Sequence, residues 1–303
     1  MIKLEYIWIE YNSLDLDGLK VFNLRSKTKI VEDNEFGDTM PSEISILWNE
    51  DSLIIKPVRL YKNPLEDNSF LVLCESFNKD RTPTQFNHRF KLNHIQGEYA
   101  KEGVFIGFEQ EYRLLKNGNP LGWDEVGPNT PNPRHDFYCG RNFGEDIARK
   151  HMNACIDAGI KILGINSECM LGQWEYQIGT DEPVIISDDL WASRWLLEKI
   201  CYNKGITVSF HPKQSYIDKS SVSFWPYNSA HTNFSTKNMR EERGESFIKE
   251  AVEKLRNKHD EHIKSYDIIK YLSYGDEKKD IKKFACDDEK NKLTSIRTII
   301  KDG

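Results

Sequence analysis

The hydrophobic pattern of this chain of 303 residues changes once along its length, and that change restricts the possible folds more than any other feature. Up to about residue 78, short apolar segments such as Ile2 to Trp8 alternate with polar residues, as half-buried strands do. From Val104 onward, strand-like segments alternate with longer helical patterns. Between the two parts, the stretch from Asn78 to His94 is polar and contains Pro83. The sequence therefore predicts a β-rich first part and a mixed second part, joined by a loop.

Local patterns predict the individual elements. Further strands are expected at Ile44–Trp48, Leu53–Leu60, Phe70–Cys74, Ile160–Ile165 and Thr207–Phe210. Helices are expected at Gly144–Ala158, which Gly159 follows, at Asp188–Asn203, with Ser187 as its N-cap, and at Phe247–Ile263, whose apolar residues form one stripe. After Ile263 the composition turns to lysine and aspartate, as in a solvated tail.

The charge and the cysteines exclude several classes of protein. The formal net charge of -6 argues against a nucleic-acid binder, which would present a basic face. The six cysteines form no CxxC pair, and the chain opens without the apolar segment of a secretory signal. No apolar run reaches the length needed to cross a bilayer. We therefore expect a cytoplasmic protein with reduced thiols that acts on small molecules, with neither nucleic acid nor membrane as a partner.

Five potential metal ligands lie in the middle of the chain, in segments that have the pattern of strands and loops. They are Glu109 and Glu111 in GFEQEY, Glu168 and Glu175 in NSECMLGQWEYQ, and His231 in AHTNFSTK. Two glutamates two residues apart in a strand project from one face of the sheet. Taken singly, such a pair is more often an exposed strand face, and a lone histidine is more often a core or loop residue. Together the five form the ligand set of a paired divalent-metal site.

The chemistry of this set indicates which metals it suits. Carboxylates with one imidazole suit Mg²⁺ or Mn²⁺, whereas zinc prefers cysteine and histidine. Paired metals held in this way neutralise phosphate oxygens during phosphoryl transfer. Because neither GxxxxGK[ST] nor GxGxxG occurs, any nucleotide would be held by another architecture.

A series of longer segments, in a fixed order, resembles a known family. LEYIWIE and LRSKTK are followed by KPVRLYKNP, LVLCESFN, TPTQFNHR, GFEQEYRLL, GQWEYQIG, LWASRWLLEKI and HTNFSTKNMRE. In this order they resemble glutamine synthetase of the eukaryotic type. The resemblance runs from about residue 4 to residue 263 and continues less closely to Arg297.

The resemblance implies a fold and a reaction. The fold is α+β, with an N-terminal β-grasp domain at residues 1–78 and a catalytic domain at residues 79–303, whose antiparallel strands form a half-barrel surrounded by helices and whose C-terminal part is shortened. The reaction is the ATP-dependent amidation of L-glutamate with ammonia through a γ-glutamyl phosphate, which serves glutamine biosynthesis and nitrogen metabolism. The family assembles as a homo-oligomer of stacked rings, with active sites between neighbouring subunits.

The resemblance also implies roles for single residues. Glu111, Glu168 and Glu175 match the three carboxylates of one metal, and Glu109 and His231 match two ligands of the second. Ser235 falls where the family places a residue near the nucleotide. Three further matches come from segments that differ more from the family: Asp51 for the aspartate that helps to bind and deprotonate ammonium, Glu277 for the flap glutamate that closes over the substrate, and Arg297 for an arginine near the end of the match.

Several positions depart from the family pattern. Lys270 and Tyr271 replace paired arginines, one of which grips glutamate in the family, and Lys292 replaces another, which keeps the charge but loses the bidentate fork. Tyr227 and Ser229 stand where glycines let the backbone approach the substrate. The loops after WNEDS and within CGRNFGEDI are short. Nothing corresponds to the family's last segment, so we expect one glutamate ligand of the second metal and one arginine to be absent.

Two hypotheses about function follow. The first is an active glutamine synthetase that uses metal, ATP and glutamate in the family's way. The second is a catalytically impaired member that keeps part of the metal and nucleotide site and acts as a binding or structural protein. The ligand set favours the first, whereas the replaced arginines favour the second, because each lost contact removes stabilisation of the transferring phosphoryl group.

Overall fold

The computed structural model describes residues 1–12, 21–33, 36–37, 39–48, 51–126, 137–211, 228–265, 286–288 and 296–298. The chain divides into two compact units, which are Met1–Ala100 with Val104–Phe234 and Lys101–Gly103 with Ser235–Gly303. These units do not test the predicted domain boundary between residues 78 and 79, which stays a prediction.

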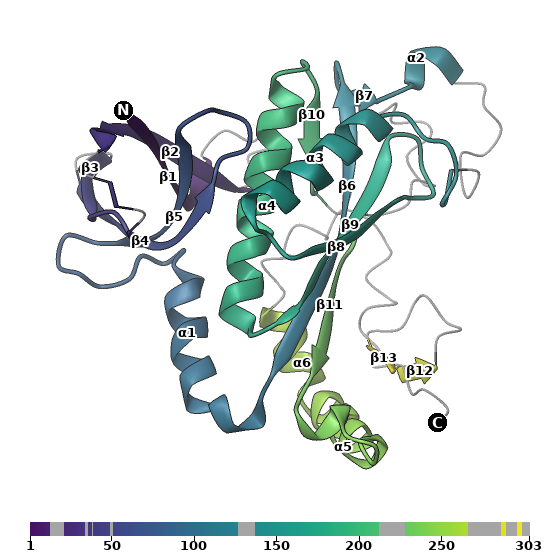
Figure 1. The fold of residues 1–303 in the computed structure, drawn as a ribbon. Coiled ribbons are helices and arrows are strands. Elements are labelled where there is room, and N and C mark those ends of the chain that lie inside the picture. Colours follow the sequence, from purple (N-terminus) through teal and green to yellow (C-terminus); the bar gives the residue numbers. More distant parts are fainter. Residues whose placement is uncertain are drawn as a thin grey trace. The chain divides into compact units, whose positions relative to one another are not determined.

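The first unit begins with a five-stranded sheet, which Figure 1 shows in purple and dark blue. Its strands are β1 (Ile2–Asn12), β2 (Val21–Val31), β3 (Ile44–Trp48), β4 (Asp51–Lys62) and β5 (Ser69–Phe77), in the order β2-β1-β5-β4-β3. The central pair β1 and β5 is parallel, and the other pairs are antiparallel. The predicted alternation is confirmed, because Leu4, Tyr6 and Trp8 join one buried cluster and Ile7 joins another.

The segment after β5 differs from the predicted loop. Helix α1 (His88–Glu98) begins inside the polar stretch that was expected to be irregular. The Asn87 side chain accepts a hydrogen bond of 3.0 Å from the backbone N–H of Phe90 and so caps the first turn. The asparagines that suggested a loop therefore include the residue that starts a helix.

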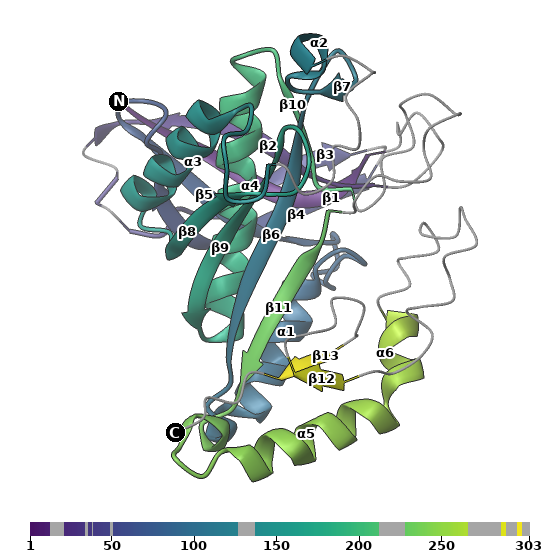
Figure 2. The ribbon, with the colours of Figure 1, turned by 90° about the vertical axis from the view of Figure 1, so that its right-hand side faces the viewer.

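The second sheet of the first unit carries the five candidate ligands except Glu168, which follows a strand directly. Its strands are β6 (Phe105–Lys116), β7 (Asn119–Pro120), β8 (Ile162–Ser167), β9 (Gln173–Asp181), β10 (Thr207–Ser209) and β11 (Ala230–Ser235). The main order is β10-β6-β9-β8, and both β7 and β11 pair with β6. Strand β6 is the longest member and runs through the centre of the sheet in Figure 2.

Helices α3 (Glu145–Ala158) and α4 (Pro183–Tyr202) supply most of the apolar packing, and a short helix, α2 (Trp123–Val126), follows β7. The predicted helix at 144–158 is confirmed, with Gly159 in the left-handed conformation at its C-terminus. Helix α4 starts five residues earlier than predicted, because Pro183 occupies its first position, where proline is well tolerated. Ser187 therefore lies inside the helix and is not its N-cap.

Helix α4 packs between the two sheets of the first unit, as Figure 1 shows. Trp195, Leu196 and Ile200 of α4 share one hydrophobic core with residues of both sheets. Ion pairs reinforce the contact with the N-terminal sheet. Arg59 of β4 binds the Asp189 carboxylate at 3.1 Å, and Asp189 is only 1% exposed.

Arg89 of α1 joins the same contact by binding two buried carboxylates. It holds Asp188 of α4 through two hydrogen bonds, at 2.8 and 3.0 Å, and Glu75 of β5 at 3.0 Å. Breaking a buried pair of this kind leaves an uncompensated charge, so the arginine holds α1, β5 and α4 together.

The second unit contains η2 (Ala100–Glu102, of which Lys101 and Glu102 belong here), η4 (Asn238–Arg240), α5 (Glu245–Asn257), α6 (His259–Ser265), β12 (Cys286–Asp288) and β13 (Ile296–Thr298). The single helix predicted at 247–263 is two helices that meet at Lys258. Asp260 and Glu261 follow in the first turn of α6, where acidic residues favour a new helix start. Most of the predicted solvated tail lies outside the described residues.

The fold class is α+β, as predicted, with a mixed N-terminal sheet and a curled antiparallel sheet packed against helices. Among the described residues, no helix combines the length and the apolar character needed to cross a membrane. None of the five cysteines whose side chains are described belongs to a disulfide.

Candidate metal centre

The strand register brings three carboxylates and one amide onto the same face of the second sheet. Glu111 of β6 lies opposite Glu175 of β9, and Glu175 lies opposite Asn166 of β8. Glu109 is two residues before Glu111 and therefore projects from the same face. Residues opposite each other on antiparallel strands have side chains within contact distance. The pairing of β6, β8 and β9 thus accounts for the meeting of glutamates that are far apart in sequence.

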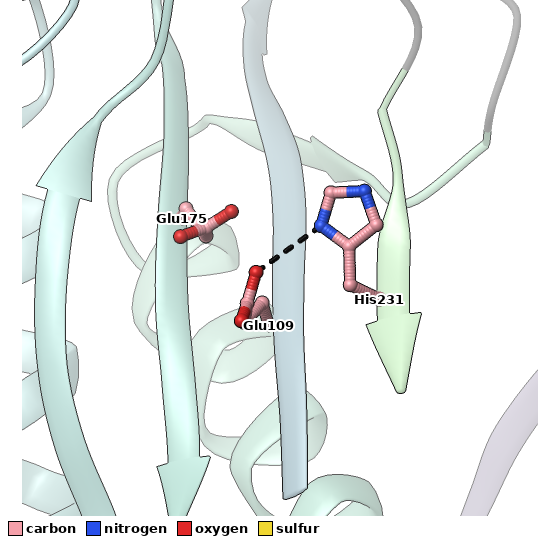
Figure 3. Close-up of side chains that lie close together, drawn as sticks. All are labelled: Glu109, Glu175 and His231. Atoms are coloured by element: carbon pink, nitrogen blue, oxygen red, sulfur yellow. Dashed lines mark hydrogen bonds and ion pairs between the residues drawn. The ribbon is translucent and has the colours of Figure 1, made fainter. Parts of the chain in front are cut away.

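The five predicted ligands form two groups that share Glu175. In the first, one carboxylate oxygen from each of Glu111, Glu168 and Glu175 lies within 4.8 Å of the others. In the second, Glu109, Glu175 and His231 each bring a ligand atom within the same limit. Figure 3 shows this second group, with the His231 ring from β11 facing Glu109 across a distance of 3.2 Å between Nδ1 and Oε2.

Burial makes the ionised form of these carboxylates costly. Glu111 is 8% exposed and Glu175 is 9% exposed. The pKa of Glu175 is raised to about 7, chiefly by burial and also by the nearby carboxylates of Glu168, Glu109 and Glu111, while a hydrogen bond from Gln177 acts against the shift. Burial also raises the pKa of Glu111, against the opposing effect of the Ser229 backbone N–H.

Polar donors hold each carboxylate in place. Glu111 Oε2 accepts hydrogen bonds from the Ser229 N–H at 2.9 Å and from Gln173 Nε2 at 3.1 Å. Glu109 Oε1 accepts one from Asn233 Nδ2 at 3.0 Å. Amide donors orient a carboxylate without cancelling its charge, so the site keeps a high density of negative charge.

This arrangement fits a hard divalent cation. The ligand atoms are carboxylate oxygens with one imidazole nitrogen, a set that suits Mg²⁺ or Mn²⁺. A cation between the carboxylates would favour their ionised forms and offset the repulsion that raises the pKa of Glu175. The residues present are therefore chemically suited to hold such an ion.

Comparison with known proteins identifies the family. The model of the glutamine synthetase catalytic domain matches residues 89–248, which include all five candidate ligands. A glutamine synthetase of Yarrowia lipolytica is 37% identical over 282 residues, covering 86% of this chain and 71% of the relative. This chain belongs to the glutamine synthetase family. The human glutamine synthetase is also 37% identical, over 271 residues that cover 86% of this chain and 70% of the human protein.

Solved structures support the fold of the family independently. A GmaS–ADP complex and ligand-free GmaS align with TM-scores of 0.57 and 0.56 at 15% sequence identity. Each alignment covers 77% of this chain but only 53% and 54% of the GmaS chains, so this chain spans about half of their length. At this identity the likeness concerns the fold alone, and it agrees with the predicted glutamine synthetase architecture.

The described part of the chain tests no role for the other residues that the family resemblance singled out. Ser235 is the last residue of β11, and its hydroxyl accepts a hydrogen bond of 2.9 Å from Arg240 within the second unit. Asp51 is the first residue of β4, and Arg297 lies in β13, but neither side chain is described. Glu277 lies outside the described residues. Their roles stay predictions.

Sequence reasoning missed the amides that surround the glutamates. Asn166 is two residues before Glu168, and Gln177 is two residues after Glu175. The alternation of side chains along a strand gave a signal for Gln177, because residues two apart share a face. The same alternation places Gln173, two residues before Glu175, on that face, but its contact with Glu111 depends on the pairing of β6 with β9.

Proposed function

We propose that this protein is a metal-dependent ligase that joins ammonia to the side-chain carboxylate of L-glutamate at the expense of ATP. The supporting observation is the convergence of four glutamates and one histidine in two overlapping groups, within a chain of the glutamine synthetase family. The reaction would pass through γ-glutamyl phosphate, from which ammonia displaces phosphate.

The ligand groups define what this chain's own residues would do. Glu111, Glu168 and Glu175 would hold one Mg²⁺ or Mn²⁺, and Glu109 with His231 would bind the second. Bound divalent cations neutralise the charge of phosphate oxygens during phosphoryl transfer. Glu175 reaches both groups, so its ionisation would couple the occupancy of one group to that of the other.

Other parts of the proposal concern substrates and assembly. We assign Ser235 to the nucleotide, Asp51 to ammonium, Glu277 to the flap over glutamate, and Arg297 to the anionic substrate groups, as the family resemblance implies. The protein would work in the cytoplasm, in glutamine biosynthesis, as a homo-oligomer of stacked rings.

The test is an assay of phosphate release or γ-glutamyl transfer with Mg²⁺ or Mn²⁺. Glu111→Ala and Glu175→Ala should each lower turnover by about 100-fold or more, because a charge-stabilising group is lost. Glu98→Ala, at an exposed position on α1, is the matched control and should keep the wild-type rate. If Glu175→Ala turned over at the wild-type rate, the metal cluster would have no part in the reaction.

A second candidate function is binding without turnover. It is favoured by Lys270, Tyr271 and Lys292 at positions where the family resemblance expects arginines. A lysine cannot form the bidentate contact that an arginine makes with a carboxylate or phosphate. Under this alternative, the protein binds Mn²⁺ and ATP but releases no phosphate above background, and a calorimetric titration combined with the turnover assay separates the two functions.

A further inference from the structure

A continuous series of hydrogen bonds joins two of the candidate ligands through side-chain amides. Asn166 Nδ2 donates to Glu168 Oε1 at 3.1 Å. Gln177 Nε2 donates both to Asn166 Oδ1, at 2.8 Å, and to Glu175 Oε1, at 2.5 Å. We call Asn166 and Gln177 the amide relay, because they connect the Glu168 carboxylate to the Glu175 carboxylate without a charged group.

The sheet register explains why these residues meet. Asn166 lies directly opposite Glu175 on the neighbouring strand, and Gln177 lies opposite both Gly164 of β8 and Glu109 of β6. The relay and the carboxylates of Glu109, Glu111 and Glu175 therefore occupy two adjacent cross-strand rows on one face of the sheet. This arrangement depends on the pairing of three strands and not on the order of residues along the chain.

Gly164 leaves the space in which the Gln177 amide lies. A Cβ atom at Gly164 would come within 2.9 Å of Gln177 Oε1, which is closer than ordinary contact. The same amide directs its Nε2 toward Glu175. The lack of a side chain at this position therefore leaves room for the Gln177 amide while it donates to Glu175.

Neutral donors suit a site that must still attract a cation. Three carboxylates within 4.8 Å repel one another, and unrestrained side chains would move apart. A lysine or arginine in place of the amides would fix them but would also satisfy their charge. An amide fixes a carboxylate through a hydrogen bond and leaves its negative charge available, which is the usual role of groups behind metal ligands.

We propose that Asn166 and Gln177 are positioning residues that set the cation affinity of the group formed by Glu111, Glu168 and Glu175, and that Gly164 provides the space for the relay. This inference rests on the proposed metal site. It assigns a role to three residues outside the proposed ligand set, and the relay acts only through the two carboxylates that it joins.

The experiment is a calorimetric titration of the full-length protein with Mn²⁺, with a thermal unfolding curve for each variant. Gln177→Met and Asn166→Leu remove the donors while keeping similar side-chain size, and each should weaken Mn²⁺ binding by about 10- to 100-fold. The double variant should lose less than the product of the two single effects, because both changes break one series of bonds.

Gly164→Ala tests the geometry with both amides still present. It should weaken Mn²⁺ binding in the same direction but by less, since the methyl group moves the Gln177 amide without removing it. Gln110→Met is the matched control, because Gln110 is a buried amide of β6 that contacts Arg194 and the Glu111 backbone carbonyl instead of a ligand carboxylate. It should leave Mn²⁺ affinity unchanged.

The outcomes separate the relay from the metal site itself. A wild-type protein that binds no Mn²⁺ overturns the proposed metal site and the relay with it. Wild-type binding that Gln177→Met, Asn166→Leu and Gly164→Ala all preserve overturns the relay alone. If Gln110→Met lost as much Mn²⁺ affinity as the relay variants, the loss would reflect general damage to the sheet, and this result would also overturn the relay. If either amide variant fails to fold, the Mn²⁺ affinity of Gly164→Ala tests the relay: weaker binding supports it, and unchanged binding overturns it.

Discussion

The raised pKa of Glu175 predicts how metal binding depends on pH. A cation binds the ionised carboxylate, so a protonated Glu175 must lose its proton before the site is complete. With a pKa of about 7, about one molecule in eleven carries ionised Glu175 at about pH 6, and about ten in eleven do at about pH 8. The apparent association constant for Mn²⁺ should therefore rise about tenfold over this range. A glutamate with an ordinary pKa would be ionised throughout and would produce no rise.

The assay is calorimetric titration with Mn²⁺ at several values of pH in buffers with known ionisation heats. Glu175→Gln keeps the shape of the side chain but cannot titrate, so its binding should be weaker and should lack the Glu175 component of the pH dependence. His231→Asn, which removes the imidazole from the second group, is measured in parallel and should keep the rise that Glu175 causes. A wild-type constant that is flat between about pH 6 and pH 8 would refute the reasoning.

The same shift has a consequence for stability without metal. The pKa of Glu175 in the folded protein lies above its ordinary value of 4.5, so the folded state holds a proton that the unfolded state has lost between about pH 4.5 and pH 7. This contribution to stability is complete below about pH 4.5 and disappears as the pH rises through about 7, with an upper size of about 3 kcal/mol. Urea unfolding at pH values on both sides of this window should show the loss in the wild type and a smaller one in Glu175→Gln.

Three further predictions concern the scaffold. Arg89→Met should lower the free energy of unfolding by about 3–5 kcal/mol in urea titrations, because two buried carboxylates lose their cation, whereas Arg149→Met at an exposed pair should cost at most about 1 kcal/mol. Gly144→Ala should lower the melting temperature more than Gly159→Ala: both have positive φ, but only at Gly144 does the new methyl group meet another side chain. Asn87→Ala should cost about 1 kcal/mol by removing the cap of α1, as chemical unfolding would measure.

The sequence predicted elements best where one local rule determines them. The strand at Ile44–Trp48 and the end of α3 at Gly159 were predicted correctly, because alternation and a C-terminal glycine act over a few residues. The start of α4 was predicted wrongly, since a serine N-cap was preferred to Pro183 at the first helical position. Helix α1 was missed because its cap, Asn87, lies among residues that also favour loops.

The sequence predicted which residues belong to the candidate site but not how they are arranged in space. The family resemblance grouped the glutamates by the metal that each would bind, and the structure brings the same side chains together. Spacing along the chain could not show that Glu175 belongs to both groups, because that depends on β9 lying beside β6 while β11 pairs on the other side. The amide relay could not be predicted from the sequence for the same reason, since Asn166 and Gln177 meet only when β8 and β9 are paired.

The partners of the buried carboxylates in this chain support a bound cation at the glutamate cluster. Where buried carboxylates serve packing, arginines neutralise them, as Arg59 does for Asp189 and Arg89 does for Asp188. The three-glutamate group instead accepts hydrogen bonds from amides and a backbone N–H, and although the charge of Arg113 lowers the pKa of Glu111, burial keeps that pKa raised. A buried negative charge that is only partly compensated is costly. Because Asp188 and Asp189 each bind an arginine whereas the three-glutamate group is held by amides, a bound cation would best supply the positive charge at this site.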